Sequence, residues 1–189
     1  MANYPYIIAS FPDLLLDYER HALDVEAVVD EVKSQLSEKD GKLVDWLSFG
    51  MVGSHLTPHF YRNIRQTRCY FLIDWFGFDR KLRLAKVAYL EGKPVQEEFP
   101  ELDKVEIIFR VDNLAQREKL LDRLLWDKAA ELVEFDIFTL DTILSLLTRL
   151  HLVERWNRLD PETGTALFRQ FVDEVRGTFH GINAEQFKV

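Results

Sequence analysis

The longest run of regularly spaced apolar residues lies between Pro58 and Glu91. Apolar side chains recur there at steps of three, four or seven residues, which places them on one face of a helix. They are Phe60, Ile64, Phe71, Trp75, Phe78, Leu82, Ala85 and Tyr89. Thr57 is a typical helix cap before a first-turn proline, and Gly92 is a typical stop. The pattern predicts one long helix, either straight or bent at Gly77.

Other amphipathic helices are expected on both sides of this segment. Asp24, Ser37 and Thr139 each precede an apolar helical pattern and are predicted to cap it. A further helix is predicted over about 112–134, and a last one from Pro161 with an apolar stripe that includes Phe168. Residues 102–111 fit either a helix or a strand. The opening residues 4–17 contain two prolines and favour an extended or loop structure.

These patterns predict an all-α bundle of about six or seven helices with one long, straight or bent, central helix. No convincing pair of strands or hairpin turn competes with this interpretation. The length of 189 residues suits a single helical domain over 1–189, or two subdomains that meet near residues 93–112. Hydrophobic residues make up 47% of the chain, which is ample for a buried core.

Positive charge is concentrated in the long segment. The chain has a net charge of −8, yet residues 55–93 hold eight basic residues against three acidic ones. The basic residues most suited to meet a partner are Arg62, Arg65, Arg80, Lys81 and Lys86. They either pair internally with the acidic helices or face an acidic partner protein. Nucleic-acid binding is not expected, because the rest of the chain would repel phosphate.

The sequence contains no recognisable catalytic, cofactor or metal motif. There is no phosphate-binding glycine loop and no nucleophile elbow. His55 and His59 are four residues apart, but Pro58 lies between them at a helix start, so they are not expected to share a metal. Cys69 lies in an apolar run and is predicted to be a buried thiol with a raised pKa. We therefore expect no enzyme activity, no cofactor and no metal.

No apolar run approaches the length of about 20 residues that a membrane span requires. The N-terminal residues lack the basic start of a signal peptide. These features favour a soluble, cytoplasmic protein, and a peripheral position at the inner membrane within a complex stays open.

Three stretches resemble a known family. They are YPYIIASFPDLLLD at the start, FLIDWFGFDRKLRLAKVAYLEGK in the middle and FDIFTLDTILSLLTRLHLVERWNRLDPETG towards the end. In order and rough spacing they are similar to an uncharacterised family of proteins encoded with the subunits of bacterial V-type ATPases. That family in turn resembles the C subunit of the V-type ATPase, also called the d subunit. This chain departs from the family's middle motif at Lys81 and Leu84, where asparagines are usual, and it is shorter than the C subunit.

The resemblance implies a helical, non-catalytic piece of the central stalk, placed over the membrane rotor ring. Other V-type ATPase subunits would then be its partners. It implies structural roles for Phe78, Asp79 and Arg83, the residues that match the middle motif. The spacing of Asp79 and Arg83 separately predicts an ion pair along one helix face. The main competing interpretation is a free-standing helical adaptor or regulator that is unrelated to the ATPase. A third is an enzyme whose site is built from residues far apart in the sequence, which would need a pocket with convergent polar groups and perturbed pKa values.

Overall fold

The computed structural model describes residues 3–19, 23–135, 137–159 and 161–179, and every regular element in these ranges is helical. The elements are α1 (Tyr4–Ser10), α2 (Val25–Gln35), α3 (Glu38–Gly50), the 3-10 turn η1 (Gly53–His55), α4 (Pro58–Gln66), α5 (Tyr70–Leu90), α6 (Leu102–Phe109), α7 (Leu114–Glu131), α8 (Leu140–Asn157) and α9 (Pro161–Phe179). The all-α prediction is confirmed. The described ranges hold nine α-helices rather than six or seven. The difference arises because the predicted long helix is two helices and the opening segment, predicted to be extended or a loop, is helical.

The predicted long helix from Pro58 to Glu91 is two helices. The break lies at Arg68, whose φ of 57° is left-handed and cannot continue a right-handed helix. Thr67 stabilises the break, because its Oγ1 donates to the carbonyl of Ile64 at 2.6 Å and accepts from the backbone N–H of Cys69 at 3.3 Å. Beyond it, α5 runs without interruption through Gly77.

The opening segment is also helical. Pro5 lies in the first turn of α1, where a proline costs no hydrogen bond, and the side chain of Asn3 caps the helix. Residues 102–109, which fit either a helix or a strand in the sequence, form α6 with Val105 and Phe109 buried. The four predicted caps are confirmed, because each side chain accepts a backbone N–H three residues ahead; they are Asp24, Ser37, Thr57 and Thr139.

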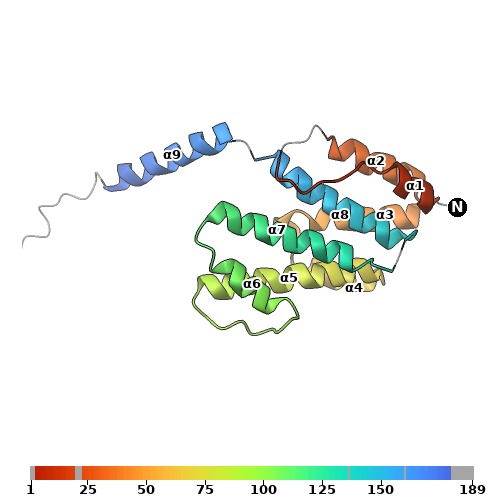
Figure 1. The fold of residues 1–189 in the computed structure, drawn as a ribbon, viewed down its shortest axis with the longest axis horizontal. Coiled ribbons are helices and arrows are strands. Elements are labelled where there is room, and N and C mark those ends of the chain that lie inside the picture. Colours follow the sequence, from red (N-terminus) through yellow and green to blue (C-terminus); the bar gives the residue numbers. More distant parts are fainter. Residues whose placement is uncertain (1–2, 20–22, 136, 160, 180–189) are drawn as a thin grey trace, which may run out of the picture.

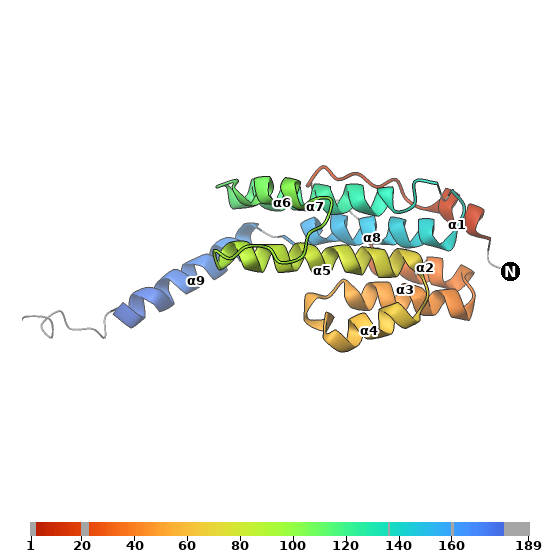
Figure 2. The same ribbon diagram turned by 90° about the horizontal axis from the view of Figure 1, so that it is seen from below.

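The bundle is organised around α8, which packs against α1, α2, α3, α5 and α7. In Figure 2, α6 and α7 lie along one side, α3 and α4 along the other, and α5 and α8 run between them. The position of α8 follows from its sequence, because Leu144, Leu147 and Leu150 are fully buried while Ser145 and Thr148 bond to carbonyls beside them.

Two apolar clusters make up the core, and α5 contributes to both. The larger one holds four apolar residues of α8 together with residues of α3, α4 and α5; these include Ile143, Leu144, Leu147, Leu150, Val44, Leu47, Phe60 and Phe76. The smaller one joins Phe78 and Leu82 of α5 to residues of α6, α7 and the loop before α6. Since both clusters share α5, this helix connects the two sides of the bundle.

The last helix, α9, leaves the bundle at the end of α8 and extends away from it (Figure 1). Leu167, Phe168 and Phe171 recur at helical spacing and are 49%, 69% and 60% exposed. These three residues of the predicted apolar stripe are therefore uncovered, whereas the side chains of Val175 and Phe179, which the prediction also includes, lie outside the described residues.

Candidate partner-binding surfaces

The structure divides the five candidate partner-binding cations into two groups. Arg80 and Lys81 lie 4.0 and 3.9 Å from the carboxylate of Glu97, in the loop before α6. Lys86 donates to Glu118 of α7 at 3.1 Å. These three cations have acidic neighbours within the chain, which agrees with the interpretation that the basic segment pairs internally.

Arg62 and Arg65 form the second group, together with Arg68. All three are exposed, and within the part of the chain that the structure describes none of them forms an ion pair. The sequence contains no Asp or Glu from Pro58 to Ile73. Phe60 and Ile64 hold the opposite side of α4 in the core. We call Arg62, Arg65 and Arg68 the α4 arginine face; it presents uncompensated positive charge on a chain that is acidic as a whole.

The three residues that match the middle motif, Phe78, Asp79 and Arg83, lie in the middle of α5. Phe78 is 5% exposed and contacts the ring of Phe99 edge-on at 6.2 Å, with the ammonium of Lys128 5.6 Å from its own ring centre. The predicted ion pair is confirmed, since Nε of Arg83 donates to Oδ2 of Asp79 at 2.7 Å.

A groove of about 900 Å³ runs between α2, α3, α5, α7 and α8. The second and third resembling stretches both line it, through Asp79 and Arg83 of α5 and Glu154 and Arg155 of α8. Its floor is apolar, because Trp75, Phe76 and Leu82 are core residues that reach its surface. The second and third resembling stretches therefore both contribute charged residues to the lining of this groove.

The charged part of this lining centres on Asp122, which is fully buried. Arg155 donates to both Asp122 and Glu118, and the indole N–H of Trp156 donates to Asp122 at 2.6 Å. Sequence analysis missed this network. Asp122 lies three residues before Leu125, so the two share one face of α7. A carboxylate on the apolar face of a helix was the sequence signal that could have indicated a buried, paired acid.

Burial acts to raise the pKa of the two carboxylates, Asp122 and Glu118, whereas their bonds to cations act to lower it. Burial raises the pKa of Asp122, and the neighbouring Arg155 and Trp156 offset only part of this effect. Burial also acts to raise the pKa of Glu118, but hydrogen bonds from Arg155 and Lys86 outweigh it and the pKa of Glu118 is lowered. The network thus ties α8 to α7 through Arg155, and Lys86 ties α5 to the same Glu118 of α7.

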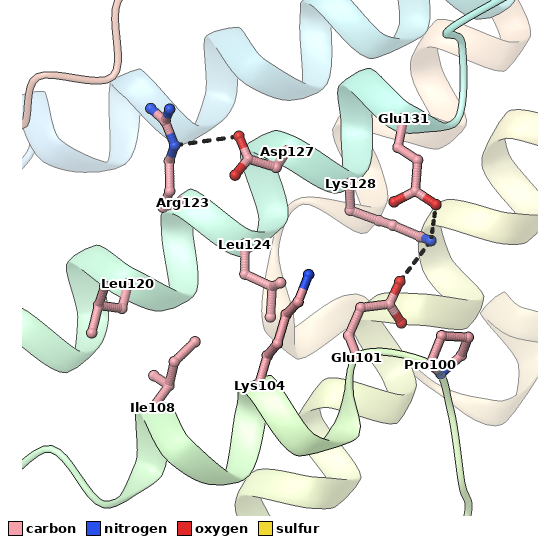
Figure 3. Close-up of a pocket in the computed structure, with 10 residues that line it drawn as sticks. All are labelled: Pro100, Glu101, Lys104, Ile108, Leu120, Arg123, Leu124, Asp127, Lys128 and Glu131. Carbon is pink, nitrogen blue, oxygen red and sulfur yellow. Dashed lines mark hydrogen bonds and ion pairs between the residues drawn. The ribbon is translucent and has the colours of Figure 1, made fainter.

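A smaller hollow of about 420 Å³ lies between α6 and α7. Figure 3 shows Lys128 of α7 between Glu101 and Glu131, at 2.8 and 3.0 Å. The Lys128–Glu101 pair is largely buried and ties the start of α6 to α7. Two further ion pairs in this hollow, Lys128–Glu131 and Arg123–Asp127, lie within α7.

Potential reactive groups are dispersed in the described residues. No three His, Cys, Asp or Glu side chains there are placed to hold a metal ion together. Nδ1 of His55 lies 2.9 Å from the carbonyl of Phe49 and must donate to it, because a carbonyl only accepts. Cys69 is buried, as predicted, and burial is the main cause that raises the pKa of its thiol to about 12. No helix in the described part of the chain is both long and apolar enough for a membrane span.

Comparison with known proteins gives one partial match. The model of a family described as "Protein of unknown function (DUF2764)" matches residues 94–178, which is less than half of the chain. This segment runs from the loop before α6 into α9 and contains the third resembling stretch, but neither of the first two. No curated protein and no solved structure gives a significant match.

Proposed function

We propose that this chain is a non-catalytic subunit or accessory of a V-type ATPase that resembles the C subunit of the central stalk. It would hold neighbouring subunits at a fixed spacing or couple their movement. The observation that supports this most is the meeting of the three resembling stretches at α8. The first forms α1, the second lies in α5 and the third forms α8, and both α1 and α5 pack against α8.

A coupling role suits the way the helices are fixed to one another. Buried helices transmit force because packed interiors compress little. Here α5, α7 and α8 share a buried apolar core and the Asp122 network, which resists sliding of one helix past another. The central helix of such a coupler is α8, with α5 beside it.

The α4 arginine face is the contact surface that we assign to an acidic neighbour. Arg80, Lys81 and Lys86 are less suited to this task, because carboxylates of the same chain lie beside them. Unpaired surface charges steer a partner into place and suppress wrong ones, mostly without a large gain in affinity. Contact through Arg62 and Arg65 should therefore weaken as the salt concentration rises.

Copurification tests the proposal. The tagged full-length chain, recovered from its native cells in mild detergent, is expected to bring V-type ATPase subunits with it. The double variant Arg62→Glu/Arg65→Glu should recover several-fold less of them, about what two charge reversals cause at an interface. The double variant Arg110→Glu/Arg123→Glu, at exposed positions just after α6 and on α7, should recover normal amounts.

Recovery of no ATPase subunit by the unmodified chain would refute the proposal. The alternative, a free-standing helical adaptor, is favoured by one observation, the uncovered apolar stripe of α9. It would gain support if the same purification recovered a different protein in constant ratio and no ATPase subunit.

A further inference from the structure

An aromatic hollow of about 590 Å³ opens between α3, η1 and α4. Its wall is formed by Trp46, Phe49, Phe60 and the ring of His55, with little polar surface between them. Phe60 is buried, whereas Phe49 is 47% exposed. An apolar concave surface of this kind is typical of sites that receive a ligand or the anchor side chain of a partner.

The hollow is held open by contacts among its own rings. Phe49 stacks on His55 at 4.0 Å between ring centres and lies 6.2 Å from Trp46 and 6.0 Å from Phe60. His55 is in turn fixed by its hydrogen bond to the carbonyl of Phe49. Since these rings are already ordered, little conformational entropy is lost when a ligand binds.

Charge around the hollow favours an acidic ligand. Two of its lining residues are charged, and each has a partner: Asp45 bonds to Lys33 at 2.5 Å and Lys42 to Glu38 at 2.7 Å. Arg62 of the α4 arginine face is three residues after His59, which lines the hollow, so the two share a helix face. The unpaired charge beside the apolar wall is therefore positive.

We propose that this hollow receives an aromatic or leucine side chain from an acidic segment of a partner protein, with Arg62 pairing a carboxylate next to that anchor. The inference rests on the α4 contact face of the proposed function and adds the apolar anchor. A nucleic acid does not fit, because a phosphate backbone offers no apolar anchor and the chain as a whole is acidic. An amphipathic segment supplies both parts in one element.

A selection from a random 12-residue peptide library on the full-length chain tests the chemistry directly. Enriched peptides should carry an aromatic residue or leucine with Asp or Glu within four residues of it. The best peptide, labelled with fluorescein, is then titrated by fluorescence polarisation at low and high salt. Its affinity should fall as salt rises, because the Arg62 pair is exposed to solvent.

Two variants and two controls separate the parts of the site. Phe49→Lys should weaken the peptide about tenfold or more, as loss of an anchor pocket does. Arg62 lies on the exposed face, so Arg62→Glu should leave the fold intact. It should weaken peptide binding several-fold and reduce or reverse the fall in affinity as salt rises, because salt now screens a repulsion. Phe135→Lys and Arg110→Glu change an exposed phenylalanine and an exposed arginine elsewhere, and should bind like the unmodified chain.

Several results would overturn the inference. They are enrichment of basic or purely polar peptides, equal binding by Arg62→Glu and Arg110→Glu, and a peptide-free dimer that Phe49→Lys abolishes, which would make a second copy the occupant. Peptide binding with no ATPase subunit in the copurification would refute the proposed function alone. Normal copurification with no peptide selected would refute the anchor pocket alone.

Discussion

Two buried carboxylates, Asp122 and Asp79, depend on their arginines to different degrees. Asp122 is fully buried and accepts from Arg155 and Trp156. Asp79 is 8% exposed, and its partner Arg83 has a side chain that is 53% exposed. The side chain of Arg155 is 44% exposed, so the two pairs differ mainly at the carboxylate, which is completely buried at Asp122 and bonded to a second donor. Water therefore screens the first pair less than the second, and the two should differ in their effect on stability.

We expect Asp122→Ala to lower the free energy of unfolding by about 3 kcal/mol, because it leaves the cation and the indole N–H without their buried acceptor. Asp79→Ala should cost about 1 kcal/mol or less, since Arg83 can turn to water. Urea denaturation of the two variants measures both values. Equal losses would contradict the assignment of Asp122 as the centre of the network.

Gly50 at the end of α3 makes close packing possible. A Cβ placed there would lie 2.3 Å from Cζ of Phe76 and 2.5 Å from Cζ of Phe60, and both rings are buried. Gly50→Ala should therefore destabilise the chain by about 1–3 kcal/mol. Gly41, on the same helix, has no atom within 4 Å of such a Cβ.

Gly41→Ala is the matched control and should stabilise the chain by about 0.5–1 kcal/mol, because alanine favours a helix interior. Thermal and urea unfolding of both variants give the comparison. A Gly50→Ala variant as stable as the Gly41→Ala variant would show that the rings can move aside.

His151 on α8 should make stability depend on pH. Burial lowers the pKa of its imidazole, although Glu154 opposes this with a hydrogen bond and Arg158 adds to it. The unfolded chain takes up the proton near its ordinary pKa of about 6.5, and the folded chain only at lower pH. The free energy of unfolding should thus fall as the pH drops below about 6.5.

His151→Gln removes this proton uptake. Between pH 7.5 and 5.5, its loss of unfolding free energy should be smaller than that of the unmodified chain by up to about 1 kcal/mol. Parallel pH curves for the His151→Gln variant and the unmodified chain would contradict the role of His151.

At the scale of elements, the helices with strong side-chain caps were predictable. The capping residues Asp24, Ser37 and Thr139 indicate where α2, α3 and α8 begin. The spacing of the leucines in α8 indicates which face of that helix is buried. The break between α4 and α5 was not predictable from apolar spacing, because the stripe continues from Ile64 to Phe71 across it. An arginine in a left-handed conformation carries no sequence signal of the kind that glycine gives.

The break is a property of the backbone at Arg68, and two substitutions should show it. Arg68→Gly relieves the left-handed strain and should keep or raise stability by up to about 1 kcal/mol. Arg68→Val should cost about 1–2 kcal/mol more than Arg68→Gly, since a β-branched side chain tolerates a φ of 57° poorly.

Chemical denaturation of the Arg68→Gly and Arg68→Val variants tests the break. A Val variant that is the more stable of the two would indicate that α4 and α5 join into the single helix that the apolar pattern predicts.

At the scale of the whole molecule, the location of the positive charge was easier to predict than the carboxylates with which each cation pairs. The sequence shows that residues 55–93 are basic but not which cations meet carboxylates far along the chain. Glu97 and Glu118 are brought to Arg80, Lys81 and Lys86 only by the packing of α5 against its neighbours. The aromatic hollow was missed for the same reason, because its rings come from α3, η1 and α4.

The helix α9 tests whether an amphipathic pattern implies a place in the core. Its stripe has the spacing of a core helix, yet Leu167, Phe168 and Phe171 are exposed and the helix extends from the bundle. The double variant Phe168→Glu/Phe171→Glu should therefore change the free energy of unfolding by no more than about 0.5 kcal/mol. By contrast, Phe109→Ala, at a residue 3% exposed, should cost about 3 kcal/mol or more.

The same double variant should bind less of a hydrophobic dye such as ANS, because it removes two of the three exposed apolar side chains of the stripe. Urea denaturation and dye fluorescence are measured on one set of samples. A loss of more than about 1 kcal/mol in the double variant would show that α9 folds back and packs on the bundle. Unchanged stability with reduced dye binding would instead establish the stripe as a surface that another molecule can cover.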